Sequence, residues 1–336
     1  MKTITIIGGG LAGLSLGNAL LRKGVPVILH EKKLYPTHRV CGEFISGVSE
    51  ETLEKLNLTQ FLSSAQSVPS VSWHIADRKI LDTSFDAPAY GISRYTLDYL
   101  LAEEFENLGG ELHTESKFKD APAEGQVWAS GKPMNQGGNW IGLSIHLSGT
   151  GVDHLEMHSG PSGYIGLSPI ENQQTNVTGL FKKDSNIKGK GLELITHYLR
   201  ANDLQALADR LAQCEAVRGS FCAISGFEFG NQSSNTALSI GDAAQLVPPF
   251  VGNGMSMALE SSAIAADIIT EYADQQISWE ECSSRIDSAC AKLFSTRMKV
   301  AMHFHPILLS KLGLKTISAT SKLHLLPVKT LYKLTR

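Results

Sequence analysis

The sequence predicts an α/β chain in which a parallel-sheet domain is interrupted by an inserted antiparallel sheet and followed by a helical tail. Three observations predict this class. Residues 3–31 run from a β-branched segment through a glycine-rich turn and an amphipathic stretch to a second apolar segment. Residues 137–230 contain short alternating segments broken by Gly, Pro and Asn, which is typical of half-buried antiparallel strands. Residues 291–336 are basic and rich in leucine.

The first unit contains Gly8-x-Gly10-x-x-Gly13 between its first strand and its helix, and Glu31 at the end of its second strand. Gly8 permits the tight turn, Gly10 lets backbone amides approach a pyrophosphate, and Gly13 allows the helix to pack closely on the strand. A carboxylate about 20 residues on can accept hydrogen bonds from a ribose diol. The unit therefore predicts a Rossmann-like dinucleotide site, although it does not by itself separate NAD from FAD.

The segment 238–260 decides between these cofactors. Gly241-Asp242 follows a short apolar run, and a proline and glycine loop (248–254) precedes a helical pattern. This segment resembles the FAD-dependent monooxygenase and geranylgeranyl reductase-like superfamily of the para-hydroxybenzoate hydroxylase-type fold, whose pattern runs GDAAxxxxPxxGxGxxxAxxxA; Ser262, with Ala263 beside it, is the one imperfect match. The resemblance implies that Asp242 binds the ribityl chain of FAD and that the amides after Gly252 face the pyrimidine end of the isoalloxazine. The dipole of the helix that starts there favours the negative charge of a reduced flavin.

Two further segments agree with this resemblance. Residues 39–43 (RVCGE) follow the first unit, and Ser93-Arg94 opens a helix where the superfamily has an R-x-x-L-x-x-x-L element. The resemblance implies that Arg39 and Arg94 contact FAD, and an arginine fork suits phosphate oxygens. A surface charge remains the alternative for Arg39. Cys41 resembles the cysteine of the reductase-like loop near the flavin, with a buried structural cysteine as the alternative.

The implied contacts and pocket can be given by residue. The expected FAD contacts are Gly8, Gly10, Leu11, Ala12, Gly13, Glu31, Lys32, Arg39, Arg94, Gly131, Gly241, Asp242, Gly252, Asn253, Gly254 and Met255. The pocket candidates are Cys41, Pro249, Phe250 and Gly252. No metal site or disulfide framework is predicted, because the five cysteines form no CxxC pair.

FAD is the predicted cofactor, and NAD(P)H is expected only as a transient reductant. The chain has 336 residues and one GxGxxG, which leaves no room for a further NAD(P)H domain. In addition, Ser130 precedes Gly131 where many aromatic hydroxylases have the Asp of a DG motif. The WxWxIP segment of tryptophan-type flavin halogenases is missing, which disfavours halogenation.

The chain order predicts a discontinuous FAD-binding domain made of residues 1–66, 93–135 and 234–290. Residues 67–92 and 137–230 are expected to form the substrate domain, whose sheet would roof the flavin by the resemblance. Residues 291–336 are expected to form a basic helical C-terminal region.

The charge of this last region differs from that of the body. The chain has a net charge of −3, yet no acidic residue follows Asp287 and nine basic residues do. Two interpretations stay open: amphipathic helices in peripheral contact with a membrane, or a helical cap on the substrate domain. No apolar run approaches the roughly 18 residues that read as a membrane span. Nucleic acid is excluded as a partner because no binding motif accompanies the bases. Without a signal-peptide pattern, the expected compartment is the reducing cytosol, with membrane association if the tail meets a membrane.

The main functional hypothesis is an FAD-dependent monooxygenase. It would hydroxylate an apolar aromatic or polyketide-like small molecule through a flavin C4a-hydroperoxide in a dry pocket. The alternatives are a flavin-dependent reductase of isoprenoid double bonds and a non-catalytic flavin-binding protein. His146, His154 and His158 lie in the predicted sheet, but a histidine in a strand is more often structural than catalytic, so the sequence names no acid or base.

Overall fold

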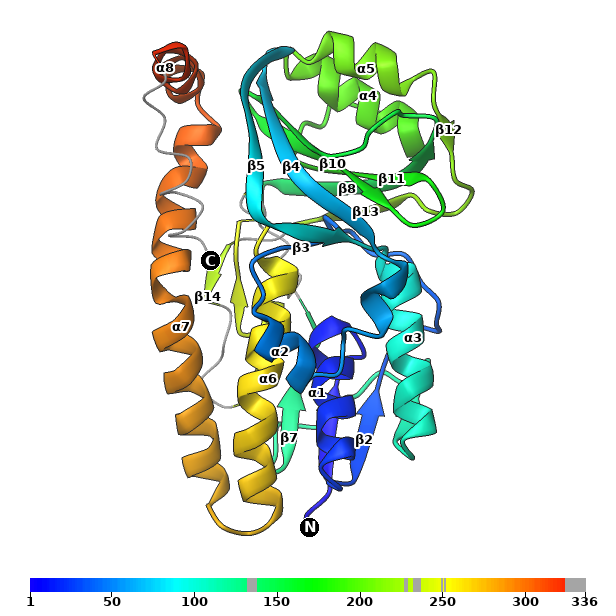
Figure 1. Ribbon diagram of the computed structural model, residues 1–336, viewed down its shortest axis with the longest axis vertical. Coiled ribbons are helices and arrows are strands. Elements are labelled where there is room, and N and C mark those ends of the chain that lie inside the picture. The colour runs from blue at the N-terminus through cyan, green and yellow to red at the C-terminus, as the bar shows by residue number, and fades with distance from the viewer. Residues whose placement is uncertain (132–137, 227–228, 232–236, 249, 251, 324–336) are drawn as a thin grey trace.

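The computed structural model describes residues 1–131, 138–226, 229–231, 237–248, 250 and 252–323. Two bodies are stacked along the long axis, and a long C-terminal helix runs along the side of both (Figure 1). The lower body contains a parallel sheet and the upper body an antiparallel one. The predicted class, a mixed α/β chain with a Rossmann-like part, an antiparallel sheet and C-terminal helices, is confirmed.

A four-stranded parallel sheet in the order β6-β2-β1-β7 forms the centre of the lower body. Its strands are β1 (Ile4–Ile7), β2 (Val27–His30), β6 (Glu111–His113) and β7 (Gln126–Trp128). The helices of this body are α1 (Leu11–Arg22), α2 (Glu50–Lys55), α3 (Arg94–Asn107) and α6 (Gly254–Ala273). α1 packs against both α3 and α6. Because helices cover this sheet, β1 (ITII) and β2 (VILH) are mostly apolar, as parallel strands usually are.

A nine-stranded sheet forms the upper body, in the order β12-β8-β11-β10-β9-β4-β5-β3, with β13 also paired to β8. Its longer strands are β4 (Gln66–Ile75), β5 (Arg78–Gly91), β8 (Trp140–Ser148), β9 (Leu155–Gly160), β10 (Gly163–Ile170) and β11 (Gln174–Lys182). The short ones are β3 (Phe44–Ile45), β12 (Glu215–Ala216) and β13 (Cys222–Ser225). One face buries Leu143, Ile145 and Leu147 against α4 (Gly191–Ala201) and α5 (Gln205–Leu211). The other face is therefore left to the lower body.

The segment around β3 joins the two bodies. Residues 44–45 belong to the range expected in the FAD-binding domain, yet Phe44 pairs with Gly91 of β5 and extends the upper sheet. The remaining short elements are η1 (Phe61–Ser64), η2 (Gly241–Ala243), β14 (Gly230–Asn231) and β15 (Gln245–Leu246).

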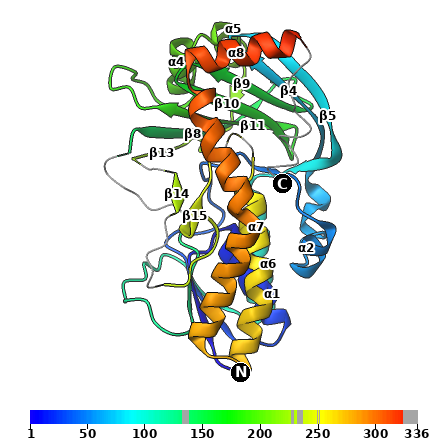
Figure 2. The ribbon, with the colours of Figure 1, turned by 90° about the vertical axis from the view of Figure 1, so that its left-hand side faces the viewer.

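The C-terminal region forms two helices that pack on both bodies. α7 (Trp279–Leu308) runs beside α6, and α8 (Lys311–Lys322) lies across the upper sheet, where it contacts β5 and β9 (Figures 1 and 2). Arg297, one of the nine basic residues, forms a buried two-pronged ion pair with Glu260 of α6. α7 thus packs on α6 of the lower body, and α8 packs on strands of the upper sheet. The side chains of Leu312 and Leu323 remain exposed, and contact with a membrane stays a prediction. Among the described helices, none has both the length and the apolar character to cross a bilayer.

Candidate active site

The turn after β1 requires glycine at two positions. Gly8 has a φ of +112°, and a Cβ atom there would lie 2.4 Å from the carbonyl oxygen of Ala129. A Cβ on Gly13 would lie 2.0 Å from the carbonyl oxygen of Gly8. In both cases the obstacle is backbone, which cannot rotate away. The glycines therefore bring α1, β1 and the segment before Gly131 into direct backbone contact.

Among the described helices, α1 and α6 differ from the rest at their first turns. Their N-cap residues are Gly10 and Asn253, and neither helix has a side-chain cap or an acidic residue in its first turn. The other helices are served by protein groups, namely Ser49, Ser93, Ser278 and Ser310 as caps, Asp77 at the start of α5 and Glu193 in the first turn of α4. A helix start without such a group suits an anionic ligand, because its N–H groups and dipole favour negative charge.

The two sequence motifs meet at α1. A Cβ atom on Gly241 would lie 3.1 Å from the Cβ of Ala12, and the hydroxyl of Ser262 on α6 donates to the Ala12 carbonyl at 2.9 Å. Asp242 sits in the same short helix, η2. The start of α1, η2 and α6 therefore form one continuous wall, although the motifs lie more than two hundred residues apart in the sequence.

Glu31 is buried and faces the glycine turn. Its carboxylate accepts the Gly9 N–H at 2.8 Å and the Lys33 N–H at 3.0 Å, and Arg39 lies 3.4 Å from it. The hydroxyl of Tyr35 donates to the Gly9 carbonyl. Glu31 thus holds the place where a ribose diol is expected, while Lys32 next to it is exposed.

Arg39 and Arg94 meet at Asp98, a residue that the sequence reading did not select. Asp98 is wholly buried, and it accepts hydrogen bonds from Arg94 Nε and Nη2 at 2.7 and 2.8 Å and from Arg39 Nε at 3.0 Å. Arg94 Nη2 also lies 3.5 Å from the point that a Cβ of Gly10 would occupy. The Arg94–Asp98 pair has the i,i+4 spacing of a helical ion pair, so a signal for Asp98 was present in the sequence.

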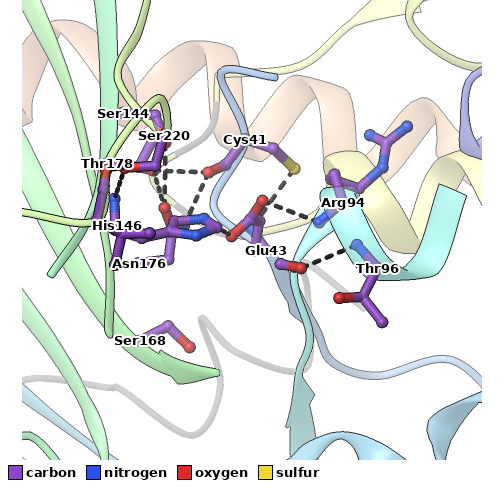
Figure 3. A network of polar contacts seen from close by, with 12 residues as sticks. Cys41, Glu43, Arg94, Thr96, Ser144, His146, Ser168, Asn176, Thr178 and Ser220 are labelled. Atoms are coloured by element: carbon purple, nitrogen blue, oxygen red, sulfur yellow. Dashed lines mark hydrogen bonds and ion pairs between the residues drawn. The ribbon is translucent and has the colours of Figure 1, made fainter. Parts of the chain in front are cut away.

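Cys41 lies in the loop that crosses from the lower body to the upper sheet (Figure 3). Its carbonyl accepts hydrogen bonds from Asn176 Nδ2 at 2.9 Å and Thr178 Oγ1 at 2.6 Å, both on β11. Its sulfur accepts the Glu43 N–H at 3.5 Å. Burial raises the pKa of the Cys41 thiol, and the charge of Arg94 opposes this effect. The loop therefore contacts both Arg94, through the carboxylate of Glu43, and the upper sheet, through the Cys41 carbonyl.

The loop before α6 supplies the other pocket candidates. Met255 is buried at the start of α6, and the hydroxyl of Ser256 donates to the Ser46 carbonyl at 2.6 Å. Phe250 packs against aromatic side chains of the upper sheet. Gly252 and Asn253 connect Phe250 to the helix, and Pro249 lies outside the described residues. This loop therefore contacts both the segment that carries Cys41 and the sheet above it.

The arrangement fits FAD in one respect that does not depend on the family pattern. Among the described residues, a Cβ on Gly10 would meet only Arg94 Nη2 within 4 Å, and Cβ atoms on Gly131 and Gly254 would meet none. The backbone is thus open at Gly10, Gly131 and Gly254, and the first and last of these stand at the uncapped starts of α1 and α6. Residues 10–13 and Arg94 would hold the pyrophosphate, and residues 252–255 would face the flavin ring.

Comparisons with known proteins agree with this geometry. Residues 1–126 match the family model described as FAD binding domain. Digeranylgeranylglycerophospholipid reductase 1 of Methanococcoides burtonii is 22% identical over 315 residues, covering 80% of this chain and 74% of that protein. PqsL of Pseudomonas aeruginosa, a probable FAD-dependent monooxygenase, has a TM-score of 0.73 at 13% identity, covering 95% of this chain and all of that one. The myxobacterial chondrochloren halogenase CndH has a TM-score of 0.74 at 16% identity, covering 100% of this chain and 91% of that one.

At these identities the solved structures show the shared fold, while the family model shows the FAD binding domain. The resemblance and the cofactor predicted from the sequence are both confirmed. The chain is an FAD-dependent oxidoreductase with an FAD binding domain at residues 1–126, and it has the para-hydroxybenzoate hydroxylase-type fold.

Proposed function

We propose that the protein is a monooxygenase that hydroxylates a small, lipophilic, aromatic or polyketide-like substrate held between the upper sheet and the loop before α6. An aromatic cluster supports this proposal. Phe250 packs against Trp73 of β4 and Tyr164 of β10 with ring centroids 5.2 and 5.3 Å apart. His305 of α7 lies edge-on to Tyr164, with the centroids 6.3 Å apart. Flat apolar molecules pack well on such an aromatic cluster, because aromatic rings prefer offset and edge-to-face contacts.

The histidine and the tyrosine of this aromatic cluster are uncharged near neutral pH. Burial lowers the pKa of His305 to about 4, so its imidazole is neutral. Burial raises the pKa of Tyr164 well above its ordinary value, so its phenol keeps its proton. None of these four rings offers a counter-charge, so a charged substrate packed on them would lose hydration, which favours a neutral one.

Bound FAD supplies the activation of dioxygen, and the chain orients the substrate and excludes water. The electron donor is a separate proposal: we expect NAD(P)H to visit transiently. Anaerobic mixing of the FAD-loaded protein with NADH or NADPH should bleach the flavin absorbance. Bleaching by dithionite alone would instead indicate a different donor.

A reductase of isoprenoid double bonds is the second candidate, and the similarity to the archaeal reductase favours it. The two functions differ in one anaerobic experiment. Reduced enzyme mixed with a polyprenyl diphosphate reoxidises if the protein is such a reductase. If it is a monooxygenase, the flavin stays reduced until oxygen is admitted.

Phe250→Ala should lower kcat/KM for an aromatic substrate by about 10- to 100-fold, because burial of an aromatic side chain is worth roughly 1.5–3 kcal/mol. FAD affinity should stay close to that of the wild type. Product formation and oxygen consumption measured together give the result. Phe85→Ala is the matched control, because Phe85 packs on Phe44 in the same sheet and away from this cluster. Equal losses in both variants would count against the assigned position of the substrate.

A further inference from the structure

A buried carboxylate and a buried imidazole meet where the two bodies join (Figure 3). Glu43 Oε2 and His146 Nε2 are 2.7 Å apart, and their side chains are 1% and 4% exposed. The other carboxylate oxygen of Glu43 accepts the backbone N–H of Arg94 at 2.8 Å. Glu43 comes from the loop after β2 and His146 from β8. Their hydrogen bond therefore connects the cofactor-binding body to the sheet.

The loop that carries Glu43 borders the FAD site on its substrate side. It touches the start of α3 through Arg94, and Ser256 in the first turn of α6 donates to its Ser46 carbonyl. The pyrophosphate side and the ring side of the site thus share this loop. An acid–base group placed on it is well situated to serve chemistry at the ring.

The proposed reaction needs such a group. Hydroxylation inserts one atom of O2 into a C–H bond and reduces the other to water, consuming two electrons and two protons. A hydride from NAD(P)H brings both electrons and one proton, so the second proton must come from solvent through the protein. Saturation of a double bond by hydride transfer requires one added proton as well. General acid catalysis requires the donor to lie within hydrogen-bond reach of the site or to act through a short relay.

We propose that Glu43 and His146 form the acid–base pair of this site and hold the proton that the reaction consumes. On one side of the pair, ring contacts lead from His146 to an exposed side chain. The ring of His38 lies edge-on to His146 with centroids 4.8 Å apart, and it stacks at 4.4 Å on Tyr95, which is exposed.

The surroundings adjust the proton affinity of Glu43. Burial raises its pKa, while the hydrogen bonds from His146 and from the Arg94 amide oppose this, and the charge of Glu171 raises it again. The titratable groups facing the pair are Cys41 and His38 in its own loop, Arg94 on α3, Glu171 after β10 and Cys222 on β13. Burial lowers the pKa of His38 to about 4, so His38 is a neutral neighbour.

The same sheet contains a matched control pair. Glu156 Oε2 and His158 Nε2 are 3.1 Å apart and both side chains are buried. His158 is opposite Ile165 across β9 and β10 and therefore faces α4 and α5 rather than the lower body. Burial raises the pKa of Glu156, but the hydrogen bonds from His158 and Arg210 outweigh it and lower that pKa to about 2. This pair should exchange no proton with the flavin site.

The test follows the number of protons coupled to flavin reduction. The midpoint potential of FAD bound to the full-length protein is measured by spectroelectrochemistry from about pH 5 to pH 9, a range that covers carboxylate and imidazole titration. Reduction adds negative charge to the site and tightens proton binding by a nearby pair. The wild type should therefore take up about one more proton per two electrons over part of this range than Glu43→Gln or His146→Gln. Glu156→Gln and His158→Gln should match the wild type.

The FAD dissociation constant is measured for every variant. His146→Gln keeps an amide that can donate to Glu43 but cannot exchange a proton, so it decides the matter if Glu43→Gln fails to bind FAD. Identical potential–pH curves in the wild type and His146→Gln, with equal FAD affinity, would overturn the proposal and leave the pair a structural tie. The proposal rests on the proposed function only for its need of a proton. Since the measurement uses no substrate, a wrong substrate class would leave its result intact.

Discussion

Replacing Asp98 by alanine should lower the free energy of unfolding by about 3–5 kcal/mol, the usual cost of removing one partner from a buried ion pair. Asp98 is wholly buried and accepts hydrogen bonds from both Arg39 and Arg94. Without it, Arg94 stays largely buried without its carboxylate partner, and Arg39 keeps only Glu31, 3.4 Å away. FAD affinity should fall as well, because Arg94 would lose the pair that aims it at the Gly10 turn. Chemical denaturation and FAD titration measure the two effects.

The same helix provides the control for Asp98. Glu104 on α3 pairs with Arg22, but both side chains are about a quarter exposed. Glu104→Ala should therefore cost at most about 1 kcal/mol, as partly solvated pairs usually do. Asp98→Asn keeps one acceptor and should fall between the two. A loss in Asp98→Ala no larger than that in Glu104→Ala would mean that the arginines find other partners.

The parts of the site that the sequence predicted are those whose chemistry is local. Gly8 and Gly13 act within one turn, and each is needed because a Cβ would strike backbone. Gly241 could be assigned to the cofactor site because it belongs to a contiguous sequence motif. Such patterns can be read without knowing the topology.

The parts that the sequence missed depend on long-range pairing. Glu43 and His146 are 103 residues apart, and only the crossing of the loop onto β8 brings them together. Tyr35 lies in the loop after β2, and no spacing rule indicates that its hydroxyl donates to the Gly9 carbonyl. Asp98 is an exception among the missed residues, because its i,i+4 spacing from Arg94 can be recognised in the sequence. Predicting that Glu43 and His146 meet would have required knowing where β8 lies relative to the lower body.

Gly13→Ala should have the second large effect. The new methyl group would lie 2.0 Å from the carbonyl oxygen of Gly8, so α1 must move away from β1. Overpacking of this kind costs about 1–3 kcal/mol, and the upper end applies because the obstacle is backbone. The displaced helix would also carry its amides away from the pyrophosphate, so FAD affinity should fall at least about tenfold. Thermal unfolding of the apoprotein and equilibrium FAD binding check both results.

Gly254→Ala separates packing from cofactor binding. Gly254 begins α6 as part of the second glycine motif, but a Cβ there would meet no atom of the described residues within 4 Å. Alanine favours helix by up to about 1 kcal/mol over glycine, so apoprotein stability should hold or rise. The methyl group would nevertheless project into the open space beside the uncapped first turn, where the flavin ring is expected, and FAD affinity should fall. If Gly254→Ala bound FAD as tightly as the wild type, the ring would have to lie elsewhere than at residues 252–255. If it also unfolded like Gly13→Ala, the two glycine motifs would both be structural rather than one packing site and one cofactor site.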